Sequence, residues 1–186
     1  MKSNPSRLST ILIFWKFSRP HTIIGSVVSI LTLYLLALKN TEYTNHLPLL
    51  MATLVVGISC NIFIVGLNQI IYVELDKLNK PDLPLASGVL SLQTANRIIR
   101  VCFGISLIGS FLLSYILGWL IVIILFIGVI YSVPTIQLKK HHLPAALSII
   151  IVRGILVNVG MYFYFRYAAL GQLGTPDPEL WSLTGL

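Results

Sequence analysis

The sequence predicts an all-α fold, a multi-pass transmembrane helical bundle of about five spans in a single membrane domain, residues 1–186. Two observations lead to this fold class. The 186 residues are 56% hydrophobic and only 10% charged, with a mean hydropathy of +0.87, which is far from a soluble domain. The apolar residues also gather in long runs, and a membrane-spanning helix needs roughly 20 predominantly apolar residues.

Five such runs are the expected spans. The fourth is short but carries no charge, and the boundary before it is expected at Gly118-Trp119. Polar loops separate the other runs, so each can form a separate helix. The runs are Thr22–Leu38, Leu47–Ile71, Ile98–Leu117, Trp119–Val133 and Leu143–Leu170.

Both cysteines, Cys60 and Cys102, fall inside these runs. We therefore expect them to be small buried residues, and we expect neither a disulfide framework nor a metal cage. No cleavable targeting signal is evident either, because Lys16 and Arg19 interrupt the N-terminal apolar stretch too early.

Basic residues alternate from loop to loop. The first loop offers only Lys39 and the third loop none, whereas the other polar segments are rich in lysine and arginine. This is the positive-inside pattern, so the N-terminus, Asn68–Arg97 and Ile136–His142 are expected to face the cytoplasm. Topology explains most of the net charge of +7, and no nucleic-acid partner is expected. The basic residues on the cytoplasmic side are Lys2, Arg7, Lys16, Arg19, Lys77, Lys80, Arg97, Arg100, Lys139 and Lys140.

The main candidate site is a row of polar side chains at the end of the second run. Asn68, Tyr72 and Asp76 are spaced four residues apart, so on one helix they share a face, and Asn61 extends that face deeper into the membrane. Glu74 points about 240° away from Asn68. Oxygen ligands in a row suit Mg²⁺, which leaves the rest of its shell to water and phosphate. A capped helix end with solvated charges would show the same spacing.

The segment after this row is predicted to be a loop. Pro81 and Pro84 exclude helix, and Lys80 supplies a point charge suited to phosphate. Ser91 is the expected N-cap of the next helix.

Three arginines are candidate ligands. Arg97 and Arg100 lie in the first turns of the third helix, where they could bind a ligand or only anchor the topology. Arg153 lies ten residues into the last run, where a charge is costly and a functional role is the first hypothesis. Pairing with backbone carbonyls or lipid headgroups is the alternative.

The same residues carry a resemblance to a known family. Asn68-Gln69…Asp76…Asn79-Lys80-Pro81-x-Leu83-Pro84-Leu85-Ala86-Ser87-Gly88 resembles the first aspartate-rich motif of the UbiA-type intramembrane prenyltransferases. Within this motif, the sequence Asn-Lys-Pro-x-Leu-Pro is similar to that of the homogentisate phytyltransferase branch. Residues 14–170 resemble the N-terminal half of such an enzyme, and 171–186 form a polar tail. Further similar segments are Phe14–Thr22, Tyr131-Ser132-x-Pro134 with Leu138-Lys139, and Arg153-Gly154-x-x-x-Asn158-x-Gly160.

The resemblance implies transfer of a prenyl (phytyl-like) group from an allylic diphosphate to an aromatic acceptor such as homogentisate, in tocopherol- or plastoquinone-type quinone biosynthesis. It implies a Mg²⁺ cofactor on Asp76 and Asn68, and a site inside the lipid bilayer of a bacterial, cyanobacterial-like membrane. Arg153 would bind the acceptor's carboxylate or the diphosphate. The implied catalytic residues are Asp76, Asn68, Lys80 and Arg153, and the implied substrate-binding residues are Asn61, Tyr72, Arg97, Tyr131, Lys139 and Asn158.

The chain departs from the family pattern in two ways. Tyr72 stands where the family motif has aspartate, and a phenol is a poorer Mg²⁺ ligand than a carboxylate. Glu74 could replace that carboxylate only if the helix unwinds locally. The family's second aspartate-rich motif is missing, since the tail has only Asp177 and Glu179. We therefore expect an N-terminal half, possessing activity only with its missing C-terminal half as partner, or a degenerate relative.

Three hypotheses follow. The first is a prenyltransferase that requires the missing half. The second is a non-catalytic remnant or assembly partner in the membrane, which Tyr72 favours. The third is half of an unrelated channel or transporter, which internal repeats would support, and no convincing repeat is found.

Overall fold

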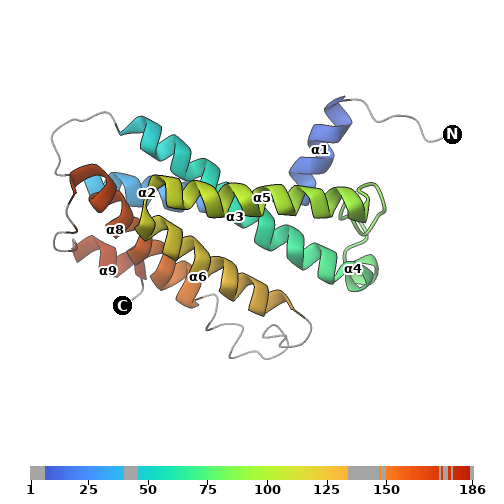
Figure 1. Cartoon of the computed structure of the whole chain (residues 1–186). Helices are drawn as coiled ribbons and strands as arrows, with labels where there is room; N and C mark the ends of the chain where they lie inside the picture. Colours follow the sequence, from blue (N-terminus) through green and yellow to red (C-terminus); the bar gives the residue numbers. More distant parts are fainter. Residues whose placement is uncertain are drawn as a thin grey trace.

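The computed structural model describes residues 7–39, 46–133, 147, 150–171, 173, 176 and 178–184, with only the backbone for 7–9. Within these ranges every regular element is helical, which confirms the all-α class (Figure 1). The whole predicted loop Ile136–His142, including Lys139 and Lys140, lies outside the described residues, as does Asp177.

Four helices in the described ranges are long and apolar enough to cross a membrane: α2 (Pro20–Leu38), α3 (Leu47–Ile71), α5 (Leu92–Leu113) and α6 (Tyr115–Ser132). They confirm the first four expected spans. The fifth is described from Ile150 onwards, as the π-helix η2 (Ile150–Leu156) and α8 (Val157–Leu170). The short helices are α1 (Arg7–Phe17), α4 (Val73–Asn79) and α9 (Pro178–Thr184).

The predicted boundary at Gly118-Trp119 is wrong, because α5 gives way to α6 at Ser114. Ser114 has an extended backbone (φ −170°, ψ 144°), and its hydroxyl caps α6 by accepting from the Ile116 N–H at 3.2 Å. Gly118 lies inside α6 instead. A Cβ there would come within 2.4 Å of the Phe111 ring, so this glycine lets α5 and α6 pack closely.

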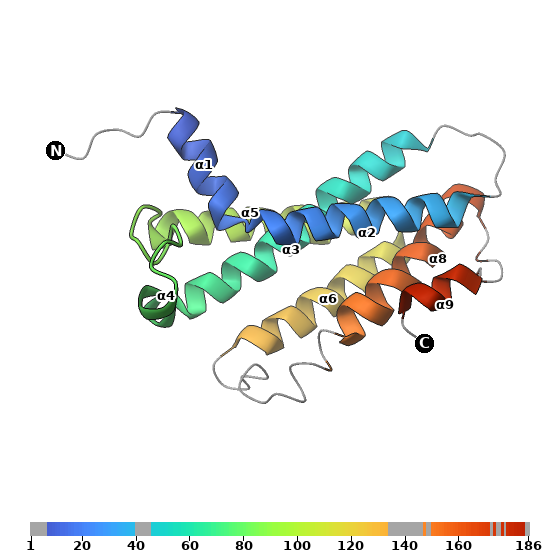
Figure 2. The ribbon, with the colours of Figure 1, turned by 180° about the vertical axis from the view of Figure 1, so that it is seen from behind.

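Successive long helices run antiparallel, which gathers specific termini at one end of the bundle (Figures 1 and 2). That end, called the motif end below, holds the start of α2, the end of α3, α4, the start of α5 and the end of α6. The start of α2 and residues 68–97 therefore lie at the same end of the bundle.

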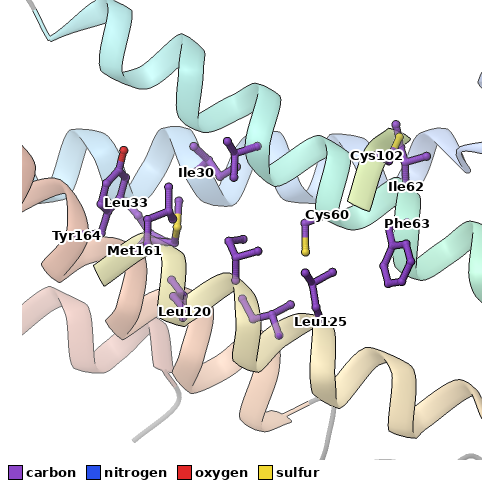
Figure 3. Packing of buried hydrophobic residues seen from close by; sticks show 14 of the residues in the cluster. Ile30, Leu33, Cys60, Ile62, Phe63, Cys102, Leu120, Leu125, Met161 and Tyr164 are labelled. Carbon is purple, nitrogen blue, oxygen red and sulfur yellow. The ribbon is translucent and has the colours of Figure 1, made fainter. Parts of the chain in front are cut away.

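Helix α3 is the centre of the bundle and packs against α5, α2 and α6. Its buried face meets apolar side chains from α2, α6 and α8 (Figure 3). Cys60 and Cys102 are both buried, as expected. The labelled core residues are Ile30, Leu33, Cys60, Ile62, Phe63, Cys102, Leu120, Leu125, Met161 and Tyr164.

The elbow between α1 and α2 is fixed to α3. Buried Phe17 lies against Gly66, and the Gln69 amide donates to the Phe17 carbonyl at 2.7 Å. Arg19, at the elbow, has φ 53°, a left-handed conformation that is uncommon outside glycine. These contacts hold the start of α2 beside the last turns of α3.

Candidate active site

The polar row of Asn68, Tyr72 and Asp76 was predicted to lie on one straight helix, but in the structure it crosses a junction between two helices. Helix α3 ends at Ile71, Tyr72 adopts φ −104° and ψ 22°, and α4 begins at Val73. The backbone N–H groups of Tyr72, Asp76 and Lys80 still donate to carbonyls four residues earlier, at 3.1, 2.8 and 2.7 Å. The predicted four-residue spacing therefore continues through the junction, with Tyr72 at its centre.

This junction does not supply a second carboxylate to the row. The Glu74 side chain is 79% exposed and pairs with Lys77 at 2.7 Å. Asp76 is half-buried, as are Asn68 and Tyr72. Asp76 is therefore the carboxylate that the row offers, together with the amide oxygen of Asn68.

Residues 80–91 form a loop, as the prolines predicted, and buried Leu85 and Leu90 anchor it. The Leu90 N–H donates to the Pro84 carbonyl at 2.8 Å. Gly88 has φ +74°, a conformation that favours glycine. Ser91 caps α5 by accepting from the Thr94 N–H at 3.1 Å, which confirms the predicted N-cap.

Exposed cations surround this loop. Lys80 lies at its start, and Arg97 and Arg100 lie on the first turns of α5. The Arg100 Nε donates to the Asn96 carbonyl at 3.2 Å. Tyr131 is half-buried in the last turn of α6, at the same end of the bundle.

A cavity of about 250 Å³ lies deeper in the bundle. It is lined by residues of α2, α3, α6, η2 and α8, is open on one side, and most of its lining is apolar. The polar lining consists of Ser26, Ser29, Asn61 and Arg153. A Cβ added at Gly25 would lie 4.0 Å from the Arg153 Nη1, so the guanidinium lies close to α2.

Asn61 is held in this cavity wall by α2. Its amide nitrogen donates to the Thr22 carbonyl at 2.8 Å and to the Ser26 hydroxyl at 2.7 Å. Asn61 lies two turns before Asn68, about 10 Å along the axis of α3. The structure thus brings two predicted residues, Asn61 and Arg153, into one cavity, with Asn68 further along the same helix.

Asn158 has a different neighbourhood. It does not line the cavity, and its amide nitrogen donates to the Leu183 carbonyl of α9 at 2.9 Å. A second contact holds the same tail, because Lys39 pairs with Glu179 at 2.9 Å. The predicted role of Asn158 in substrate binding remains a prediction.

Comparison with known proteins agrees with this arrangement. Residues 26–186 match the UbiA prenyltransferase family. The chain belongs to this family. It is 42% identical to "Homogentisate phytyltransferase" of Synechocystis sp., over 95% of this chain and 58% of the relative. It is 36% identical to "Homogentisate phytyltransferase 1, chloroplastic" of Arabidopsis thaliana (86% and 42%), and 39% identical to that plant's "Homogentisate solanesyltransferase, chloroplastic" (84% and 42%). The chain thus spans about half the length of these relatives. No solved structure matches it.

The donor set of this UbiA chain fits a metal that is shared with a ligand. In the part of the chain that the structure describes, no three histidine, cysteine, aspartate or glutamate side chains gather as a metal cluster. Asp76 and Asn68 offer one carboxylate and one amide oxygen. Mg²⁺ accepts such a sparse set because phosphate oxygens and water complete its shell.

Sequence reasoning missed two features of the UbiA cavity. Ser26 and Ser29 lie on α2 among apolar residues, and no pattern marked them as lining residues. Arg153 was selected as a charge within an apolar run, but its π-helical setting was not foreseen. Such wider turns often occur at functional sites.

Proposed function

We propose that this chain is the motif-bearing half of a prenyltransferase that transfers a phytyl-like group from an allylic diphosphate to an aromatic acceptor. The relatives quoted above are all named for homogentisate, whereas the prenyl group in their names differs. Homogentisate is therefore the acceptor that we propose.

The observation that carries this proposal is the placement of two polar zones along α3. Asn61 and Arg153 line one cavity, and Asn68 with Asp76 lies toward the motif end. The offset of about 10 Å between Asn61 and Asn68 suits two substrates that meet between the zones. The acceptor ring would occupy the cavity, and the diphosphate would bind at the motif end.

The charged residues of the motif end have roles in this reaction. Asp76 and Asn68 would hold Mg²⁺, which neutralises charge on the diphosphate when bound. Lys80, Arg97 and Lys139 would share the charge of the leaving diphosphate. The bond between the allylic carbon and the diphosphate oxygen breaks with its electron pair on oxygen, a ring carbon bonds to the allylic carbon, and that ring carbon then loses its proton, which restores the aromatic ring. Tyr131 offers a ring face to the cationic allyl group.

The proposed setting is a bacterial, cyanobacterial-like membrane with the motif end facing the cytoplasm. Basic residues concentrate at this end, and positive-inside asymmetry then sets the orientation. A water-soluble diphosphate group would reach the motif end from that side, while the prenyl chain stays in the bilayer.

Transfer of radiolabelled phytyl from its diphosphate to homogentisate, in membranes with Mg²⁺, tests the proposal. The wild-type chain and Tyr72→Asp are each assayed with and without a co-expressed C-terminal half from a relative. We expect activity only in the presence of that half, and a higher rate for Tyr72→Asp because it restores a carboxylate to the row.

A non-catalytic relative is the second candidate, and Tyr72 in the polar row is the observation that favours it. Activity confined to Tyr72→Asp would identify a disabled chain on an intact scaffold. Absence of transfer from all four preparations, with stable membrane insertion, would replace the proposed enzyme by a remnant or assembly partner.

A further inference from the structure

The orientation of the Asn61 amide is fixed by the chemistry of its partners. A backbone carbonyl can only accept a hydrogen bond, so the Asn61 atom 2.8 Å from the Thr22 oxygen must be the amide nitrogen. A flipped amide would place two acceptor oxygens at that distance. The Thr22 carbonyl therefore determines which side of the Asn61 amide carries oxygen.

Ser26 reinforces this orientation. Its hydroxyl donates to the Thr22 carbonyl at 3.1 Å, which leaves the hydroxyl oxygen to accept from the Asn61 nitrogen at 2.7 Å. Both N–H groups of Asn61 are thus used on α2. The same turn of α2 supplies both acceptors, so the amide is oriented before any ligand enters.

This leaves the Asn61 Oδ1 as an acceptor at the cavity wall. It takes no hydrogen bond from any residue that the structure describes. Arg153, also in the lining, has only donors, because a guanidinium carries five N–H groups and no acceptor. A complementary ligand therefore needs a hydrogen-bond donor for Asn61 and an anionic acceptor for Arg153.

The size of the cavity restricts that ligand further. Its volume of about 250 Å³ lies below the roughly 300–1,000 Å³ of pockets that hold drug-sized ligands. A single ring with a short acidic side chain suits this space. The mostly apolar lining suits the ring face.

We infer that Ser26 and Thr22 are positioning groups that make this cavity select a hydroxylated aromatic acid. The ligand's ring hydroxyl donates to the Asn61 Oδ1, and its carboxylate binds Arg153. The inference rests on the proposed function for the identity of the acceptor, and adds the residues that discriminate between acceptors. Sites that bind a substrate hydroxyl reject analogues without it because their own polar group then stays unsatisfied.

Equilibrium dialysis against the full chain in lipid nanodiscs tests this selection without requiring transfer. Radiolabelled homogentisate is compared with phenylacetate, which keeps the ring and carboxylate but lacks both hydroxyls. One additional hydrogen bond should give the wild-type chain about tenfold tighter binding of homogentisate. Asn61→Ala should abolish that preference, and Ser26→Ala should reduce it by about threefold or more.

Thr32→Ala is the matched control, because Thr32 is an exposed hydroxyl residue on the same helix, α2, and does not line the cavity. It should keep the full preference. Phenylacetate affinity should stay unchanged in all three variants, which a general loss of structure would not allow. If Ser26→Ala folds poorly, Ser26→Thr keeps the hydroxyl and should retain the preference.

Three results would overturn the inference. Equal binding of both ligands by the wild-type chain would remove hydroxyl selection, and an unchanged preference in Ser26→Ala would remove the positioning role. If the chain binds neither homogentisate nor phenylacetate, the cavity is not the acceptor site. Failure of phytyl transfer with the preference intact would reject the proposed enzyme but keep the inferred site.

Discussion

The deep cavity and the motif end are organised in opposite ways. In the cavity, Asn61 is held by two hydrogen bonds of 2.8 and 2.7 Å. At the motif end, Lys80, Arg97 and Arg100 are exposed, and Glu74 pairs with its neighbour Lys77 on α4. The cavity therefore presents a polar amide whose orientation the protein fixes, and the motif end presents a group of exposed charges.

This difference follows from what each region is proposed to bind. An aromatic acceptor has few polar atoms, so its ring carbon is directed only if the protein's polar groups are already oriented. A diphosphate carries high charge and shares a metal, so exposed cations can reorient onto it when it arrives. Substitutions in the cavity should change acceptor choice, and substitutions at the motif end should change metal dependence.

The largest expected effect is at Asp76. Asp76→Asn keeps the shape of the side chain but removes the carboxylate from the row, so transfer with the co-expressed half should fall by about 10²–10³. Binding of the allylic diphosphate should also lose its dependence on Mg²⁺. Glu74→Gln is the matched control, because Glu74 is exposed on the same short helix and should change transfer little. Equal losses in both variants would indicate a general charge effect in place of a metal site.

The next effect separates the two regions directly. Arg153→Gln should weaken acceptor binding roughly 10- to 100-fold, the cost of one charged hydrogen-bond partner, and leave diphosphate binding unchanged. Arg97→Gln should do the reverse, weakening diphosphate binding and leaving acceptor binding unchanged. Dissociation constants of both ligands, measured for both variants, check this. Loss of diphosphate affinity in Arg153→Gln would remove the distinction between the regions.

These two regions also differ in how far the sequence predicted them. Features encoded by local residues were predicted correctly: four apolar spans, the Ser91 cap and the proline-containing loop at 80–91. The turn at Ser114 was missed because apolar residues flank it, and only helix capping and the close packing at Gly118 mark it.

The cavity was harder to predict because it depends on contacts between distant segments. Asn61 and Arg153 were each selected from their own run, but nothing local showed that they share a wall. Ser26 gains its role only from its distance to Asn61. Local unwinding of the helix near Tyr72 was considered only as a way to bring Glu74 into the polar row. The structure has a helix junction at Tyr72 but leaves Glu74 at the surface.

A third prediction concerns the joint between the two regions. Gly66 lies on α3 between Asn61 and Asn68, and a Cβ there would come within 2.5 Å of Ile99 and 2.9 Å of Phe17. Gly66→Ala should therefore reduce the free energy of unfolding in mixed micelles by about 1–3 kcal/mol through overpacking. Gly104→Ala is the control, because no side chain or backbone lies within 4 Å of its added Cβ. If both variants are equally stable, the elbow is not tightly packed against α3.

The smallest effect tests whether Asn158 belongs to either region. Asn158→Ala removes one hydrogen bond to the Leu183 carbonyl, which should cost about 0.5–1.5 kcal/mol and speed amide hydrogen exchange in α9. Glu179→Gln weakens the exposed pair with Lys39 and should accelerate that exchange less. Since Asn158 does not line the cavity, homogentisate affinity should stay unchanged in both variants. A selective loss of that affinity in Asn158→Ala would instead extend the acceptor site beyond the cavity. The Leu183 carbonyl would then compete with the substrate for the Asn158 amide, so deleting α9 should increase acceptor affinity.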